Sequence, residues 1–268
     1  MAVYHRDNAE LFERAVCSVY ENTLRPDAFV LVVDGPVPYL LGRRIGALQK
    51  RFGFIIHVLA QNQGLASALN AGLDKVTTEW VLRADADDIN LATRFELQAS
   101  MVERDPSLTI LGTAILEVEP DGAVLAVRRP PSSHAEITHF ARMRNPFNHM
   151  TVAYRTSHAK RCGGYPNIRL KEDYGLWALM LQRGAHTANL PEILVHATAG
   201  QDMYRRRGGW QYARDEIQLQ RHLVRCGVKG WAAGTLHAFM RGAVFLMPPL
   251  LRGSIYRKAL RHREGTAQ

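Results

Sequence analysis

The chain has 268 residues, of which 47% are hydrophobic and 22% charged, and its formal net charge is +9. This length allows one sizeable α/β domain with an appendage, but not two full α/β domains. From Arg205 onward there are 13 Lys and Arg against 3 Asp and Glu, so the first 204 residues are almost neutral. A basic segment of this kind can meet a nucleic acid, an anionic membrane surface or a phosphorylated substrate.

The sequence contains no signal-peptide pattern, because its first residues are polar and no apolar segment follows them. The most apolar stretch, 231–251, is interrupted by His237, Arg241 and a Pro pair at 248–249, which excludes a transmembrane helix and leaves an interfacial segment at most. The three cysteines are far apart and lack metal-ligand spacing, so we expect reduced thiols in a cytoplasmic chain.

Apolar periodicity predicts that helices and buried strands alternate over the first 90 residues. The expected elements are a helix over 9–21, a strand over 29–33, a helix ending near 50, a strand over 54–59, a helix over 65–75 and a strand over 80–82. This alternation predicts an α/β fold with a mixed, mainly parallel sheet and helices on both faces.

The pattern changes after residue 90. The expected elements are a helix over 91–103, a strand over 108–116, a hairpin partner over 123–128, a helix over 134–143 capped by Ser132 or Ser133, a strand over 151–154, a helix over 171–183 and a strand over 192–196. The remainder is mostly helical. We therefore expect one domain over 1–204 and a helical, basic extension over 205–268.

Three carboxylates, Asp85, Asp87 and Asp88, follow the expected strand over 80–82. Carboxylates this close repel one another, and burying them without a counter-charge is costly. A divalent cation such as Mg²⁺ or Mn²⁺ resolves this, since it prefers oxygen ligands and often carries a diphosphate. The strand end is also where open α/β sheets bind ligands. The alternative is a helix start capped by Asp88 or Asn90, for which one carboxylate would be enough.

Five short signatures occur in one order along the chain. They are Val-Val-Asp-Gly at 32–35, Asn-Gln-Gly-Leu-Ala-Ser-Ala-Leu-Asn at 62–70, Arg-Ala-Asp-Ala-Asp-Asp at 83–88, Asn-Pro-Phe-Asn-His-Met-Thr at 145–151 and Glu-Asp-Tyr-Gly-Leu-Trp at 172–177. Each is weak or moderate alone. Together they resemble family 2 glycosyltransferases, the inverting GT-A enzymes that use nucleotide sugars. The resemblance runs to about residue 210 and is strongest to enzymes of bacterial exopolysaccharide and lipopolysaccharide synthesis, such as amylovoran-type transferases.

The resemblance implies a donor site. Asp34 matches the position that bonds the uracil or ribose, Tyr4 an aromatic beside the base, and Asn62 the start of the donor-side loop. Asp34 and Asn62 can equally be turn residues. The acidic residues carry the Mn²⁺ or Mg²⁺ and the diphosphate, with Asp87 on the metal, Asp85 on the ribose or the metal, and Asp88 sharing either task. Arg83 is expected to contact phosphate or to pair with these acids.

The acceptor side is implied in the same way. Asp173 matches the base that deprotonates the acceptor hydroxyl, and Glu172 its partner, although acids at a helix start also stabilise the helix dipole. His149 matches the acceptor lining, with a satisfied core histidine as the alternative. The late basic and aromatic motif, expected near the diphosphate and acceptor or else as a solvated basic turn, comprises Arg205, Arg206, Arg207 and Trp210.

Two features depart from the family pattern. His196 is the one imidazole near the position of a third metal ligand, and its register is doubtful, so we do not count it as a ligand. The first strand is short, with only Met1-Ala2-Val3 before Tyr4, which predicts that a chain extended upstream would be markedly more stable; equal melting temperatures would contradict this.

The expected activity is metal-dependent, inverting transfer of a hexose from a UDP-sugar to a saccharide or polyprenyl-diphosphate-linked acceptor. The basic extension is expected either to contact the inner face of the cytoplasmic membrane or to pack on the main domain. We do not expect a nucleic acid among the partners. The alternatives are a non-catalytic nucleotide-sugar-binding protein and a basic protein that binds nucleic acid or membrane.

Overall fold

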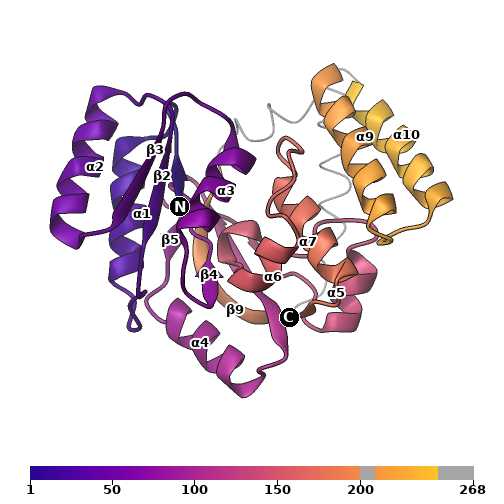
Figure 1. Cartoon of the computed structure of the whole chain (residues 1–268), viewed down its shortest axis with the longest axis horizontal. Helices are drawn as coiled ribbons and strands as arrows, with labels where there is room; N and C mark the ends of the chain where they lie inside the picture. Colours follow the sequence, from indigo (N-terminus) through magenta and orange to yellow (C-terminus); the bar gives the residue numbers. More distant parts are fainter. Residues whose placement is uncertain (200–208, 247–268) are drawn as a thin grey trace. The chain divides into compact units, whose positions relative to one another are not determined.

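The computed structural model describes residues 1–199 and 209–246, and the chain divides into two compact units, 1–199 and 200–268. Figure 1 shows the helices and strands of both units. The three cysteines all lie in the described residues and are free thiols, as expected, with Cys162 and Cys226 buried and Cys17 half-buried.

The first sheet of the larger unit is parallel, in the order β1 (Ala2–Val3), β2 (Val30–Asp34) and β3 (Ile55–Leu59). Helices α1 (Ala9–Tyr20) and α2 (Tyr39–Phe52) share a buried apolar cluster with Leu31 and Val33 of β2. Helix α3 (Leu65–Lys75) covers the opposite face, where a Cβ on Gly72 would lie 3.2 Å from Val32 Cγ2. The expected helices on both faces are therefore confirmed.

The second sheet is mixed. Its order is β4 (Trp80–Leu82), β8 (Ala153–Arg155), β6 (Leu108–Val118), β9 (His186–Thr198) and β5 (Ile89–Asn90), with β7 (Val124–Arg128) also paired to β6. Only β6 and β9 run parallel among the described pairs of this sheet; the others are antiparallel. The mixed α/β fold is confirmed, but the mainly parallel arrangement holds for the first sheet and not for the second.

The remaining helices of this unit are α4 (Arg94–Arg104), α5 (His134–Phe140), the 3₁₀ turn η1 (His149–Thr151), α6 (Thr156–Arg161) and α7 (Glu172–Gln182). The core beneath α7 is aromatic: Trp177 packs edge-on against Phe147 and tilted against Tyr154, and all three side chains are almost fully buried. Because Phe147 lies two residues before η1, this core connects the segment that leads into η1 with α7.

Three local expectations needed correction. Helix α4 begins at Arg94 rather than Leu91, because Ile89 and Asn90 pair with β9 as a short strand. Asp88 and Asn90 therefore do not cap that helix; Thr93 precedes it. The strand expected over 192–196 is longer, because β9 starts at His186 and follows β6 along its length. The cap of α5 is confirmed, with Ser133 and Glu136 forming a capping box.

The smaller unit contains a helical hairpin, α9 (Trp210–Arg225) and α10 (Trp231–Leu246). Tyr212 and Phe245 pack edge to face between the helices. Lys229 donates to Gln220 Oε1 at 2.7 Å, and Gln220 donates in turn to Glu216 Oε1 at 2.7 Å. The outer side of α10 remains exposed and apolar, with Trp231 and Phe239 each 76% exposed. None of the described helices is long and apolar enough to cross a bilayer.

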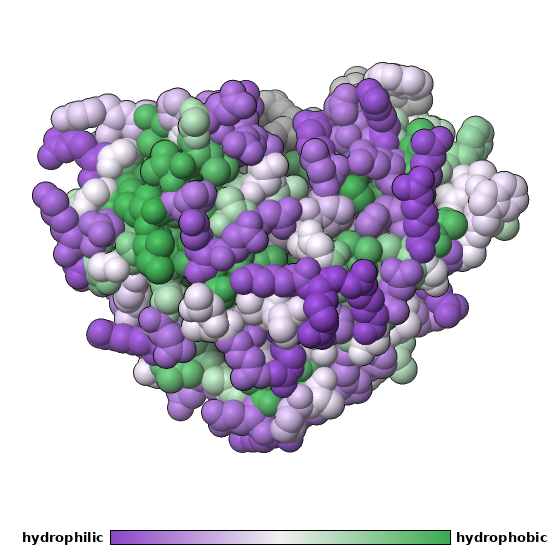
Figure 2. Space-filling view, viewed as in Figure 1, coloured by the Kyte–Doolittle hydropathy of each residue, from purple (hydrophilic) through white to green (hydrophobic). Residues whose placement is uncertain are grey.

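Figure 2 shows one face of the molecule, with hydrophobic side chains gathered over the region where Figure 1 draws β2 and β3. Ile55 and Val58 of β3 are 48% and 64% exposed. A cavity of about 430 Å³ in the same unit is lined by residues such as Val30, Trp80 and Tyr154, whereas the acidic residues at 85–88 do not line it.

Candidate active site

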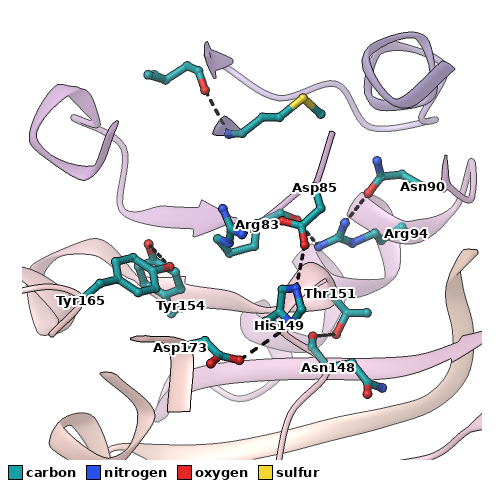
Figure 3. Close-up of polar contacts among 12 residues, drawn as sticks. Arg83, Asp85, Asn90, Arg94, Asn148, His149, Thr151, Tyr154, Tyr165 and Asp173 are labelled. Atoms are coloured by element: carbon teal, nitrogen blue, oxygen red, sulfur yellow. Dashed lines mark hydrogen bonds and ion pairs between the residues drawn. The ribbon is translucent and has the colours of Figure 1, made fainter. Parts of the chain in front are cut away.

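The acidic loop, residues 83–88, joins β4 to β5. Its first residue is tied to the second sheet, since the Arg83 N–H donates to the Val152 carbonyl at 2.8 Å. The Arg83 guanidinium is almost fully buried and lies 2.5 Å from Asp85 Oδ1, so an ion pair begins the loop (Figure 3). Burial opposes this cation, but Asp85, together with Tyr165, Tyr154 and Glu172, raises the pKa of Arg83 above its usual value. The expected pairing of Arg83 with the acids is thus present.

A second arginine, which the sequence did not single out, supports the same loop from below. Arg94 is completely buried, and its guanidinium donates to the Arg83 carbonyl at 2.8 Å, to Asn90 Oδ1 and to Gln98 Oε1. Burial lowers the pKa of Arg94 to about 9. One side chain therefore connects the first residue of the acidic loop with the strand that follows the loop. An arginine in an amphipathic helix resembles an exposed residue in the sequence, so only its three-dimensional position reveals this role.

Asp85 lies between two cationic groups. Its Oδ1 faces Arg83, and its Oδ2 lies 2.7 Å from Nε2 of His149 (Figure 3). Burial works against ionisation, but Arg83 and His149 hold the pKa of the Asp85 carboxyl well below its usual range. Asp85 is therefore ionised at neutral pH, and both of its oxygens face protein groups.

The other two acids of the loop have opposite surroundings. The side chain of Asp87 is exposed, and its carbonyl accepts a hydrogen bond of 2.5 Å from Thr198 Oγ1 of β9. Asp88 is buried, and its Oδ1 accepts from the Thr198 N–H at 2.8 Å. Within the described part of the chain, Asp88 Oδ2 has no hydrogen-bond partner. Burial, followed by Asp87 and Asp85, raises the pKa of Asp88.

His149 reaches this loop from η1. Its side chain is 41% exposed, and its Nδ1 lies 3.8 Å from Asp173 Oδ2. Desolvation opposes protonation, but Asp85 and Asp173 together outweigh it and raise the pKa of His149 to about 9. His149 therefore lies between the acidic loop and α7. It is not the buried core histidine that the sequence left as an alternative.

The acidic pair Glu172 and Asp173 opens α7. Asp173 Oδ2 accepts a hydrogen bond of 2.6 Å from Asn145 Nδ2. Glu172 is 6% exposed, and burial, together with the neighbouring Asp173, raises its pKa to about 7. The two carboxyls therefore differ: Glu172 is held toward its neutral form, while Asp173 faces two nitrogen-bearing side chains, Asn145 and His149.

Asp34 ends β2 and closes the turn into α3. Its two carboxylate oxygens accept from the N–H groups of Gln63 and Gly64 at 2.7 and 3.0 Å, and Asn62 Nδ2 donates to its carbonyl at 3.2 Å. Gly35 has φ +82°, and a Cβ there would lie 2.4 Å from the Asn62 nitrogen. The turn role that the sequence left open for Asp34 and Asn62 is therefore present in the structure.

Tyr4 and an unexpected acid share the loop after β1. The Tyr4 N–H donates to Asp7 Oδ2 at 2.9 Å. Burial raises the pKa of Asp7 to about 7, and the carboxylates of Asp87 and Asp85 add to this rise. Asp7 therefore belongs to the electrostatic surroundings of the acidic loop. The sequence signal for it was weak, since an Asp before the helix cap Asn8 resembles an ordinary turn residue.

The structure brings together four of the expected residues, Arg83, Asp85, His149 and Asp173, in one chain of contacts. Trp210 is the first residue of α9 in the smaller unit and is 74% exposed. Arg205, Arg206 and Arg207 lie outside the described residues, so the late basic motif is not placed.

Among the described residues, no group of three His, Cys, Asp or Glu side chains forms a metal-binding cluster. A Mg²⁺ or Mn²⁺ ion that arrives with a diphosphate does not need such a cluster, since one or two carboxylates and the phosphate oxygens complete its shell. The exposed Asp87 beside the ionised Asp85 is a donor set of this kind. The residues therefore fit a metal carried by its substrate.

Residues 1–165 match the family described as Glycosyl transferase family 2. The amylovoran biosynthesis glycosyltransferase AmsE of Erwinia amylovora is 37% identical over 96% of this chain and 97% of its own length. A UDP-Gal:alpha-D-GlcNAc-diphosphoundecaprenol beta-1,3-galactosyltransferase of Escherichia coli is 33% identical over 97% and 95%.

Solved structures agree on the fold. The first 349 residues of TarS from S. aureus superpose with a TM-score of 0.65 and 15% identity, covering 90% of this chain and 70% of that one. The mannosyltransferase PcManGT from Pyrobaculum calidifontis, solved with GDP-Man and Mn²⁺, gives a TM-score of 0.62 and 16% identity over 98% and 80%. These likenesses support the GT-A fold expected from the sequence.

Proposed function

The chain belongs to glycosyl transferase family 2 and is a glycosyltransferase of bacterial polysaccharide synthesis, and from this premise we propose that it transfers a hexose from a UDP-sugar to a lipid-linked saccharide, with a divalent metal and with inversion. The observation that carries the proposal is the contact chain from Asp85 through His149 to Asp173. This chain supports the proposal because it joins Asp85, which we assign to the donor side, through one imidazole to Asp173, which we assign as the base.

The donor lies along the carboxyl ends of β2 and β4. Asp34, Asn62 and Tyr4 surround the nucleoside, with the main chain at 62–64 already ordered by Asp34. Asp87 would hold the metal with help from Asp85, and Arg83 neutralises Asp85 while Asp88 anchors the loop to β9. When bound, the metal would supply positive charge to the departing diphosphate.

The acceptor hydroxyl lies against the start of α7. Asp173 removes its proton while the oxygen attacks the anomeric carbon from the side opposite the UDP group. The new glycosidic bond forms as the bond between the anomeric carbon and the diphosphate oxygen breaks, which inverts the anomeric configuration. Glu172, whose pKa is raised toward neutrality, serves as a hydrogen-bond donor beside the base rather than as a second charge.

A lipid-linked acceptor agrees with the exposed apolar side of α10. Four large side chains there are exposed: Trp231, Leu236, Phe239 and Met240. They are spaced as one side of a helix, and the segment after residue 204 carries the whole positive excess of the chain. The galactosyltransferase relative is named for a diphosphoundecaprenol acceptor. We propose that this side of α10 contacts the cytoplasmic face of the membrane that holds the acceptor.

The test is a transfer assay with a panel of UDP-hexoses and GlcNAc-diphosphoundecaprenol in detergent, with release of UDP and the lengthened lipid both measured. We expect a product with at least one donor, and Asp173→Asn should keep UDP binding but lower turnover by about 10²-fold or more. Transfer by Asp173→Asn at the wild-type rate would remove Asp173 from the mechanism. UDP binding without any transfer would instead support a non-catalytic nucleotide-sugar-binding protein.

A further inference from the structure

The main chain around His149 is held to β6 by the side chains of its neighbours. The neighbouring side chains Asn148 and Thr151 are 1% and 0% exposed. Asn148 Nδ2 donates to the Thr113 carbonyl of β6 at 2.9 Å, and the Thr113 N–H donates to Thr151 Oγ1 at 2.9 Å. Side chains on both sides of His149 therefore bond the 3₁₀ turn to β6. These bonds hold the main chain that carries the imidazole in place.

The imidazole uses both of its nitrogens toward acids from different halves of the site. Nε2 lies 2.7 Å from Asp85 Oδ2, which is a strong hydrogen bond, and Nδ1 lies 3.8 Å from Asp173 Oδ2, which is an ion-pair distance (Figure 3). Asp173 Oδ2 also accepts from Asn145 at 2.6 Å. Asn145 and His149 therefore approach the same oxygen of Asp173.

We propose that His149 is a positioning residue, which is fixed by Asp85 and holds Asp173 at the angle needed to receive the acceptor proton. This inference rests on the proposed function, since it names how the base of that reaction is oriented. Because Asp85 belongs to the donor side, the same contact makes the placement of the base depend on the state of the donor site. His149 itself touches neither the leaving group nor the reacting oxygen in this account.

A positioning role predicts a specific kinetic pattern. His149→Ala leaves the Arg83 contact of Asp85 in place, so the dissociation constant for UDP should change by no more than about twofold. The turnover number should fall by roughly tenfold or more, because a misplaced catalytic group loses rate steeply with small displacements. His149→Gln can still bond Asp85 but cannot span both acids, so it should resemble His149→Ala.

The decisive experiment is a double-mutant cycle with Asp173→Asn, in which UDP release is measured with the donor and acceptor used above. If His149 acts through Asp173, then His149→Ala should cost nothing further in the Asp173→Asn background. Additive losses in the cycle, or wild-type turnover by both His149 variants, would overturn the inference. The exposed His139 on α5 gives the control variant His139→Ala, which should match the wild type.

Two further readouts separate the possible failures. The melting temperature of each variant, including His149→Gln, shows whether a lower turnover number is caused by unfolding. Absence of transfer by the folded wild type would overturn the proposed function and this inference together. Wild-type transfer with an unaffected His149→Ala would overturn the inference alone.

Discussion

The Arg94 guanidinium, at the start of α4, donates a hydrogen bond of 2.8 Å to the main-chain carbonyl of Arg83, the first residue of the acidic loop. Arg94 is fully buried, and the partners it contacts through hydrogen bonds are neutral oxygens. The carboxylates of Asp85 and Asp88 lie near enough to favour its charge. The buried Arg94 side chain therefore holds the first residue of the acidic loop in place without a bound ligand.

Arg94→Met should destabilise the fold by about 2–4 kcal/mol, because it leaves three buried acceptors without their donor. The loss is measured as a shift in the midpoint of urea unfolding. Arg104→Met is the matched control on the same helix, since Arg104 is exposed, and it should remain within about 0.5 kcal/mol of the wild type. Equal midpoints for the two variants would show that Arg94 does not support the loop.

Glu172→Gln should stabilise the protein in a pH-dependent way. Burial and Asp173 raise the folded-state pKa of Glu172 from the unfolded value of 4.5 to about 7. Ionisation of this carboxyl therefore destabilises the fold, with no penalty below about pH 4.5 and the full penalty above about pH 7. Between pH 5 and pH 8, the stability advantage of Glu172→Gln over the wild type should grow by about 2–3 kcal/mol. A constant difference across this range would contradict the assigned burial effect.

The exposed side of α10 should bind anionic membranes. Trp231→Ser combined with Phe239→Ser removes the two most exposed aromatic side chains of the helix and should lower sedimentation with phosphatidylglycerol vesicles by roughly tenfold. Tyr39, which is 80% exposed in the larger unit, supplies the control Tyr39→Ser. If the double variant sediments like the wild type, then α10 is not the membrane contact.

The sequence predicted best those helices and strands whose bounds are set by neighbouring residues in the chain. Helix 65–75 and strand 80–82 were predicted with their observed bounds, since a glycine turn precedes the helix and the apolar runs are clear. The first half of β9 was missed, and Pro191 stands directly before the part that was predicted. In the structure it lies at a register shift, where pairing passes from Thr113 with Leu190 to Ala114 with Ile193. A bulge tolerates the missing N–H of proline.

In the candidate site too, features set by local sequence were predicted and features set by long-range contacts were not. The residue types at 85–88, at 149 and at 172–173 follow from motifs, so those acids and the histidine were identified without the structure. That His149 lies between Asp85 and Asp173 depends on how β4, η1 and α7 meet, which is a long-range property. Arg94 and Asp7 were missed for another reason. Arg94 is fully buried, and Asp7 is half-buried near the carboxylates of Asp85 and Asp87, and neither position has a sequence signature.

Calorimetric titration of UDP, with and without Mn²⁺, into the wild type, Asp87→Asn and the exposed-surface control Asp74→Asn shows whether Asp87 carries a metal and the donor diphosphate. We expect the wild type and Asp74→Asn to bind UDP at least tenfold more tightly with Mn²⁺, and Asp87→Asn to lose this gain. UDP binding that depends neither on Mn²⁺ nor on Asp87, or no UDP binding by the folded wild type, would contradict this assignment of Asp87.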